Sequence, residues 1–172
     1  MSKVATFVRD ITLRVHKKHP SRGWTLLEMM VVVVVLGVVM AIALPSIRRA
    51  RMGSRIQEAQ AQVELLSAAI MQLAWDTGRW PTGKPRNNTT GQEAWDLTVP
   101  RAGLVATDGS FPDWNGPYIR EIPEDPWGNP YFFDEDYSFG GKTIFVVGSF
   151  GPNGNGRNVY DSDNIFVQVA ER

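Results

Sequence analysis

The side chains most able to bind a ligand lie in one glycine-rich segment near the end of the chain, residues 148–164, GSFGPNGNGRNVYDSDN. Asn153, Asp161 and Asp163 offer amide and carboxylate oxygens there, and the glycines let backbone carbonyls turn inward. Calcium takes about six to eight such oxygens in flexible geometry. The segment is not an EF-hand, because the acidic first position and the final glutamate of that motif are missing. It predicts either a calcium site or a hairpin loop that holds no metal.

Residues suited to catalysis are scarce. The two histidines, His16 and His19, lie near the N-terminus, and the chain contains no cysteine. The remainder therefore lacks the usual nucleophile–base pairs and zinc ligands. Residues 134–136 are three adjacent carboxylates, but neighbours on a strand point to opposite faces, so we expect them in a solvated loop. We expect a protein that is neither an enzyme nor a nucleic-acid binder.

An apolar segment dominates the N-terminal part of the chain. Residues 24–44 contain one ionisable side chain, Glu28. A helix rises about 1.5 Å per residue, so this segment spans roughly 30 Å, the thickness of the hydrocarbon core of a bilayer. A membrane-spanning helix is predicted over residues 24–47. A carboxylate is costly there, so either Glu28 lies near the membrane surface or its partner belongs to another molecule.

Charge is divided unevenly along the chain. Residues 1–23 hold six basic side chains and one acidic one, whereas the remainder holds twelve basic and seventeen acidic ones. The positive-inside rule predicts a cytoplasmic N-terminus and an exported C-terminal domain. Four arginines follow the apolar segment and oppose this orientation more weakly: Arg48, Arg49, Arg51 and Arg55. An ordinary secretory signal, cleaved near residues 41–43, is the alternative.

The helix is expected to continue beyond the apolar segment. Pro45 removes a backbone donor, so a kink or local unwinding is expected over residues 41–45. Residues 48–78 then form an amphipathic half that ends at Gly78. Spacings of three and four place one apolar stripe on a single face of this half, and the stripe is Ile56, Ala59, Val63, Leu66, Ile70 and Leu73. The same spacing also fits a coiled coil, but the run is short, so a sheet packed on the stripe is preferred.

Residues 79–172 read as a globular α/β region. Proline, glycine and asparagine cluster as turn signals at residues 115–118 and 125–131. Strands are predicted from Tyr131–Phe133, over Thr143–Gly148 and over Asn164–Val169. One or two short helices are predicted within residues 92–105, around residues 93–97. The fold class is therefore α+β, a long helix on a small antiparallel sheet. Five tryptophans are expected in its core: Trp75, Trp80, Trp95, Trp114 and Trp127.

Four motifs resemble the type IV pilin-like family, and within it the major pseudopilins of type II secretion systems. RGWTLLE at residues 22–28 resembles the class III signal of that family, although Trp24 stands where phenylalanine is usual. DTGRWPT at residues 76–82, NGPY at 115–118 and DPWGNPY at 125–131 resemble major-pseudopilin signatures. The resemblance extends from residue 22 almost to the end of the chain, and it implies a pilin-like fold.

The resemblance implies processing and assembly roles for several residues. A prepilin peptidase would remove residues 1–23 as a leader, cleaving between Gly23 and Trp24 and methylating the new N-terminus of Trp24. Glu28 would be the fifth mature residue, whose carboxylate neutralises the methylated amine of a neighbouring subunit. Pro45 falls at a position where family members commonly carry proline, and we expect it to contribute to assembly.

The resemblance also bears on the metal and on disulfides. In major pseudopilins a loop S-x-G-x-D-G, followed by D-I, binds one calcium ion. SFGPNG at residues 149–154 places Asn153 at the first aspartate, while Asp163 most nearly matches the second and Asp161 is the alternative. Many type IV pilins close their C-terminal region with a disulfide, which a chain without cysteine cannot do. The missing disulfide favours the pseudopilin branch.

The resemblance thus implies a structural subunit that would polymerise into the periplasmic pseudopilus of a type II secretion system and drive protein export. The expected partners are further copies of itself, minor pseudopilins, the inner-membrane assembly platform, the prepilin peptidase and inner-membrane lipid. The expected cofactor is Ca²⁺. Two alternatives remain: a type IV pilin for adhesion, motility or DNA uptake, and a membrane-anchored periplasmic enzyme.

Overall fold

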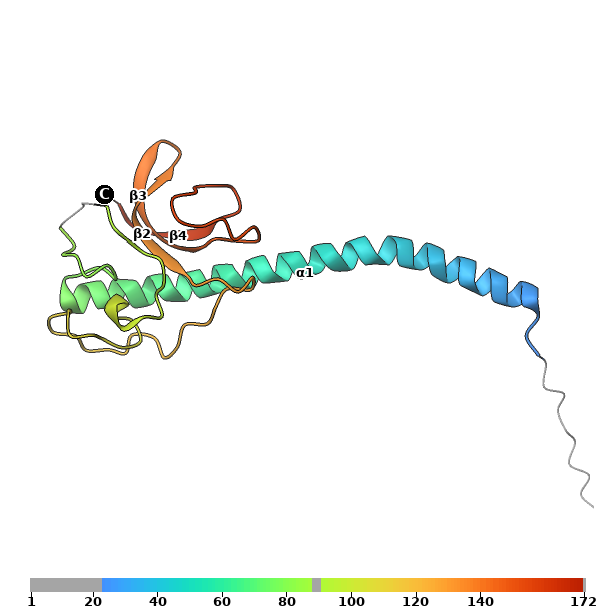
Figure 1. The fold of residues 1–172 in the computed structure, drawn as a ribbon, viewed down its shortest axis with the longest axis horizontal. Helices are drawn as coiled ribbons and strands as arrows, with labels where there is room; N and C mark the ends of the chain where they lie inside the picture. The colour runs from blue at the N-terminus through green and yellow to red at the C-terminus, as the bar shows by residue number, and fades with distance from the viewer. Residues whose placement is uncertain (1–22, 88–90, 172) are drawn as a thin grey trace, which may run out of the picture. The chain divides into compact units, whose positions relative to one another are not determined.

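The computed structural model describes residues 23–87 and 91–171 (Figure 1). Apart from Gly23, the predicted leader lies outside the described residues. The chain divides into two compact units at the bond between Leu44 and Pro45, and each unit is described by itself. One helix, α1 (Leu26–Thr77), contributes to both units.

The N-terminal half of α1 is apolar and exposed. An 18-residue window of this helix has a mean hydropathy of 2.8 and none of it is buried, so the helix is long and apolar enough to cross a membrane. The α-helical backbone runs without a break through Pro45, so the local unwinding expected there is not seen. The exposed apolar side chains of this half need lipid or another protein to cover them.

The C-terminal half of α1 carries the predicted apolar stripe. Six of its apolar side chains are buried in one core with residues of the sheet: Val63, Leu66, Ala69, Ile70, Leu73 and Ala74. Their sheet partners include Phe133, Phe145 and Val147. Ile56, at the start of the predicted stripe, is exposed instead. The helix therefore packs on its own sheet, as expected from the spacing, and not in a coiled coil.

The sheet has four antiparallel strands in the order β1-β2-β3-β4. Their bounds are Glu93–Ala94, Phe132–Phe139, Lys142–Ser149 and Ile165–Glu171. The three predicted strands and the α+β fold class are confirmed. One short helix does form within the predicted range 92–105, but its placement around residues 93–97 is wrong, because the backbone of β1 pairs there with Asp134 and Phe133 of β2. The helical turn lies further on, as the 3-10 helix η1 (Pro100–Ala102).

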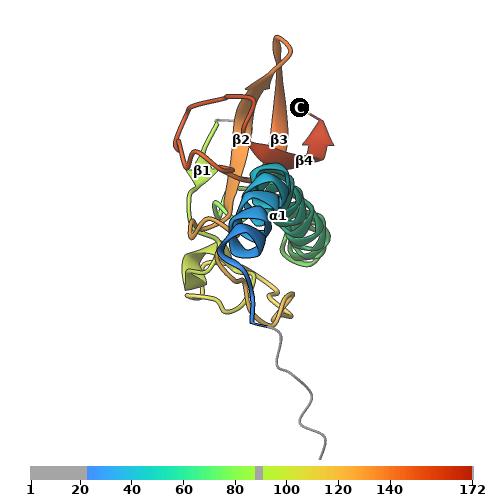
Figure 2. The same ribbon diagram turned by 90° about the vertical axis from the view of Figure 1, so that its right-hand side faces the viewer.

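Both faces of the sheet are covered (Figure 2). Phe133 faces the α1 core, whereas its neighbour Phe132 belongs to a second cluster with Tyr137, Val146 and Phe150. Adjacent residues of a strand point to opposite faces, so the second cluster lies on the face turned away from α1. Phe150 stacks on Phe132 with ring centroids 4.6 Å apart. The segment 148–164 therefore covers this second face.

Candidate functional site

The start of α1 is closed by a reciprocal pair of hydrogen bonds. The Glu28 backbone N–H donates to the Thr25 hydroxyl at 3.2 Å, and the Thr25 backbone N–H donates to the Glu28 carboxylate at 3.5 Å. This is a capping box, which satisfies two helix N–H groups that otherwise lack partners. Gly23 and Trp24 precede the helix and are exposed. The pattern Thr25-x-x-Glu28 is readable in the sequence, yet the prediction for Glu28 did not include it.

The glycine-rich loop is anchored at its beginning by a buried carboxylate. Asp125, 4 % exposed, accepts hydrogen bonds from the backbone N–H groups of Trp127 and Asn129 and from the Ser149 hydroxyl. The Ser149 oxygen in turn accepts from the Gly151 N–H at 3.0 Å. The DPWGNPY turn thereby fixes where the loop leaves β3.

The predicted metal ligands are brought together only in part. The side-chain amide nitrogen of Asn153 donates to the Asp161 carboxylate at 2.8 Å. The side-chain oxygen of Asn153 accepts from the backbone N–H of Asn155 at 2.7 Å. Asp163 donates its backbone N–H to Asp161 at 3.1 Å. Of the two acidic candidates, it is therefore Asp161 whose carboxylate lies against Asn153.

The two ends of the loop approach each other closely at Gly151. Gly151 has a positive φ of 70°, and a Cβ at this position would lie 1.9 Å from the carbonyl oxygen of Asp163, so only glycine permits the close approach of the two loop ends. The Asp161 carboxylate lies against the Asn153 amide, whose nitrogen faces it, and the Asp163 carbonyl oxygen lies at Gly151. This donor set suits a hard cation, with Asn153 and Asp161 as the converging side chains.

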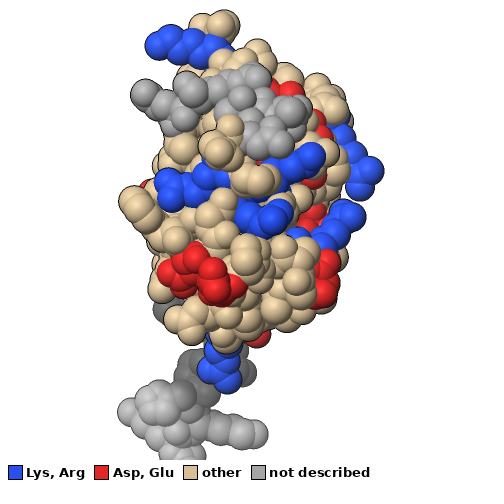
Figure 3. All heavy atoms as spheres, turned by 90° about the vertical axis from the view of Figure 1, so that its left-hand side faces the viewer, with Lys and Arg blue, Asp and Glu red and all other residues tan. Residues whose placement is uncertain are grey.

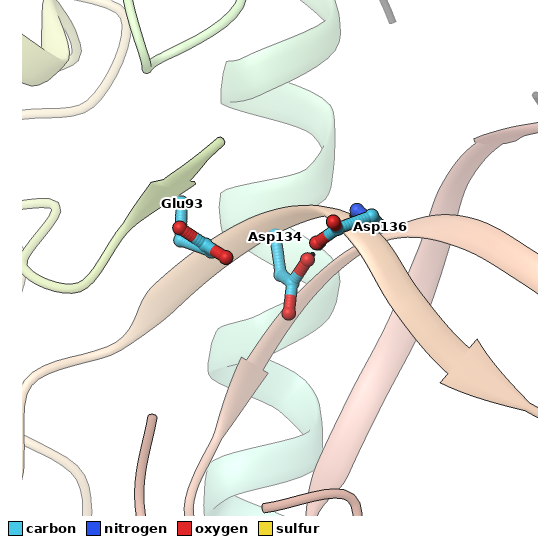
Figure 4. Close-up of side chains that lie close together, drawn as sticks. All are labelled: Glu93, Asp134 and Asp136. Atoms are coloured by element: carbon cyan, nitrogen blue, oxygen red, sulfur yellow. Dashed lines mark hydrogen bonds between the residues drawn. The ribbon is translucent and has the colours of Figure 1, made fainter. Parts of the chain in front are cut away.

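Three carboxylates from β1 and β2 form a cluster outside the predicted metal site (Figure 4). Ligand oxygens of Glu93, Asp134 and Asp136 all lie within 4.8 Å of one another, and the Asp136 N–H donates to Asp134 at 2.8 Å. The expectation of a solvated loop over residues 134–136 is wrong, because they lie in β2, which is flanked by β1 and β3 and covered on both faces. Glu93 stands directly opposite Asp134 across the β1–β2 ladder.

Burial sets the protonation of this carboxylate cluster. Asp134 is 1 % exposed, and its burial, followed by the nearby Asp136 and Glu93, raises its pKa to about 7. Burial and then the charge of Asp136 raise the pKa of Glu93. On the other face of β2, burial raises the pKa of Glu135, whose carboxylate accepts a hydrogen bond from the Thr82 hydroxyl. The cluster alone does not define a ligand.

Comparison with known families distinguishes between the major pseudopilins and the type IV pilins. A family model described as type II secretion system (T2SS), protein G, matches residues 47–165, more than two thirds of the chain. The chain belongs to this family. A second model, the prokaryotic N-terminal methylation motif, matches residues 18–44.

Relatives from the T2SS protein G family are similar in sequence to this chain over most of their length. Type II secretion system core protein G of Aeromonas hydrophila is 31 % identical over 80 % of this chain and 90 % of its own. The protein of the same name from Klebsiella pneumoniae is 33 % identical over 77 % and 86 %, respectively. The crystal structure of the major pseudopilin from enterohaemorrhagic Escherichia coli aligns with a TM-score of 0.46 at 21 % identity, covering 68 % of this chain and 85 % of that one.

Membership of the T2SS protein G family confirms the predicted family and its function in secretion, in preference to the type IV pilin alternative. The family is a structural one, which agrees with the expectation that the chain is not an enzyme. The cleavage site, the assembly roles of Trp24, Glu28 and Pro45, and the calcium ligands stay predictions.

Proposed function

We propose that the chain, once cleaved after Gly23, polymerises through the apolar half of α1 into the periplasmic filament of a type II secretion system and moves folded proteins outward. The observation that carries the proposal is the unburied apolar half of α1, in a chain of the T2SS protein G family. Lipid covers such a surface before assembly, and neighbouring subunits cover it afterwards. Contacts between unlike surfaces that do not close a ring generate an open helical filament.

The methylation motif supports the processing step of this proposal. The matched residues 18–44 include the bond between Gly23 and Trp24. Cleavage there leaves Glu28 in the first turn of α1, close to the new terminal amine. In the filament the Glu28 carboxylate would pair with the methylated amine of a neighbour, so that neither charge stays unpaired in an apolar environment.

The location and partners follow from the same mechanism. Before assembly the subunit would be held in the inner membrane by residues 24–47, with its C-terminal domain in the periplasm. Its partners would be the prepilin peptidase, the assembly platform, minor pseudopilins and membrane lipid, and it would need no catalytic activity of its own.

Calcium would act as a structural cofactor of the C-terminal domain. Asn153 and Asp161 would supply side-chain oxygens, after rotation of the Asn153 amide, and backbone carbonyls near Gly151 would complete the set. The ion would tie the two ends of the loop together in a domain that has no disulfide.

Deletion and complementation test this function. A strain whose copy of this gene is deleted should stop secreting its type II substrates, and the intact gene should restore both secretion and filaments that react with antibodies to the C-terminal domain. Normal secretion in the deletion strain would refute the proposal. Loss of twitching motility or DNA uptake with secretion intact would instead support the pilin alternative.

A further inference from the structure

The segment that follows α1, residues 78–86, is a rigid basic loop. Its ends are joined by a hydrogen bond from the Arg86 N–H to the Gly78 carbonyl at 2.9 Å. Within the loop the backbone N–H of Trp80 donates to the backbone carbonyl of Lys84 at 2.9 Å. The Trp80 ring is 3 % exposed and packs between Phe133 and Phe145. The loop is therefore fixed to the core through Trp80.

This loop holds an exposed tryptophan in place. The Arg86 guanidinium lies 4.7 Å from the ring centroid of Trp75 and 5.8 Å from that of Trp80, so it connects an exposed ring with a buried one. Trp75 is 69 % exposed, contrary to the expectation that it belongs to the core. Within the described part of the chain, Arg86 forms no ion pair with a carboxylate. Trp75 and Arg86 are thus preorganised and exposed, and no carboxylate among residues 23–87 and 91–171 pairs with Arg86.

The charge of the loop is opposite to that of the rest of its domain. Residues 78–86 contain Arg79, Lys84 and Arg86 and no acidic residue. Residues 56–172 as a whole contain eight basic and sixteen acidic side chains. Figure 3, which looks toward the end of α1 that precedes this loop, shows lysine and arginine side chains gathered across the middle of that face. The remainder of the domain, and therefore that of a second copy of the chain, carries a net negative charge, opposite to that of the loop.

We propose that Trp75 and Arg86 form a contact with an acidic surface on the C-terminal domain of a second copy of this chain in the filament. This inference rests on the proposed function. Tryptophan and arginine are the residues that most often dominate the energy of protein interfaces, and little ordering entropy is lost when both are already fixed. An open filament needs two unlike surfaces on each subunit, and a basic loop on an otherwise acidic domain provides such a pair.

Photo-crosslinking identifies the partner directly. Trp75 is replaced with a benzophenone amino acid in the full chain, which is expressed together with its secretion system and irradiated during filament assembly. We expect an adduct of twice the subunit mass that maps to an acid-bearing segment of the second copy. The matched control carries the same amino acid at Phe139, an aromatic 60 % exposed at the end of β2, and should give little of this adduct. An adduct with lipid or with another protein, or no adduct, would overturn the inference.

Charge reversal provides the second measurement. Arg86→Glu should reduce the amount of filament about tenfold, the effect of losing one strong interface residue. Lys142→Glu, which reverses an exposed charge at the start of β3, should leave the amount of filament unchanged. Equal melting temperatures of the two variants would show that both are folded. Normal filaments from Arg86→Glu would refute this contact alone, whereas an unmodified chain that forms no filaments would refute the proposed function as well.

Discussion

The Ser149 hydroxyl donates a hydrogen bond of 2.5 Å to the carboxylate of Asp125, which lies 24 residues earlier in the chain. The same carboxylate accepts the N–H groups of Trp127 and Asn129, so one buried side chain joins the DPWGNPY turn to the end of β3. The family signature therefore has a structural role in this chain: it fixes the start of the glycine-rich loop. The stability of the domain should depend on this carboxylate.

Asp125→Ala should lower the free energy of unfolding of the fragment 45–172 by roughly 2–4 kcal/mol, because it leaves buried donors without a partner. Ser149→Ala should cost about 1 kcal/mol, and the double variant should cost less than the sum of the two. Urea denaturation measures all three. Glu121→Ala, at an exposed acid, is the control. Strict additivity of the two changes would contradict the coupling of turn and loop.

Glu28→Ala and Glu28→Gln separate the charge of Glu28 from its capping role. Glutamine can also complete a capping box, whereas alanine cannot. If pairing of the charge drives assembly, both variants should insert into the membrane and both should fail to form filaments. Thr25→Ala, which removes the other half of the box at a cost of about 1 kcal/mol, should still assemble. Normal filaments from Glu28→Gln would mean that helix capping is the role of this residue. Electron microscopy and secretion assays provide the readout.

Processing should occur between Gly23 and Trp24. Intact mass of the membrane form should show a chain that begins at Trp24 and carries one added methyl group. Gly23→Leu should leave the full-length chain uncleaved and stop assembly, since the preceding residue no longer fits the predicted recognition site. A product that begins near Ser46 would show instead that an ordinary secretory signal had been cleaved.

Calcium should stabilise the fragment 45–172. An ion that binds only the folded state adds roughly 2.7 kcal/mol at a concentration one hundred times its dissociation constant, which raises the melting temperature by several degrees. Magnesium should do less, because it demands a tighter octahedral site. Asp161→Ala should abolish the effect, and Asn153→Asp should increase it more than the matched change Asn155→Asp. If Asp163→Ala abolishes the effect and Asp161→Ala does not, Asp163 and not Asp161 is the acidic ligand. A melting curve that responds to neither calcium nor chelator would exclude the site.

Stability should fall as the pH rises toward neutrality. The pKa of Asp134 is about 7 in the folded protein against 3.8 ordinarily, so the folded state holds this proton more tightly. The resulting stabilisation is complete below about pH 4 and is lost as the pH rises through about 7, by roughly 2–4 kcal/mol. Asp134→Asn keeps an acceptor for the Asp136 N–H but removes the charge, so its unfolding free energy should vary less with pH and be higher at pH 8. Parallel pH curves for the two proteins would contradict this.

Regular spacing in the sequence predicted the regular parts of the fold. The stripe from Ala59 to Leu73 repeats with the period of a helix, and the β-branched content of residues 143–148 is typical of a strand. β1 has two residues, too few for a period, and it forms only because β2 supplies its partners. The carboxylate cluster was missed for the same reason, since Glu93 meets Asp134 through β1. The contact of Arg86 with Trp75 crosses a turn and has no periodic signal.

The loop that covers the second face of the sheet also keeps aromatic side chains of that face away from water. Phe150 and Tyr160 of this loop contact Phe132 and Tyr137, which would otherwise present aromatic rings to water. A protease that cut within residues 153–158 would release this cover while leaving α1 and the strands intact. The nicked domain would then expose a flat apolar sheet face, the kind of surface through which β-proteins aggregate. We therefore expect cleavage of this loop to lower the solubility of the domain before it unfolds the domain.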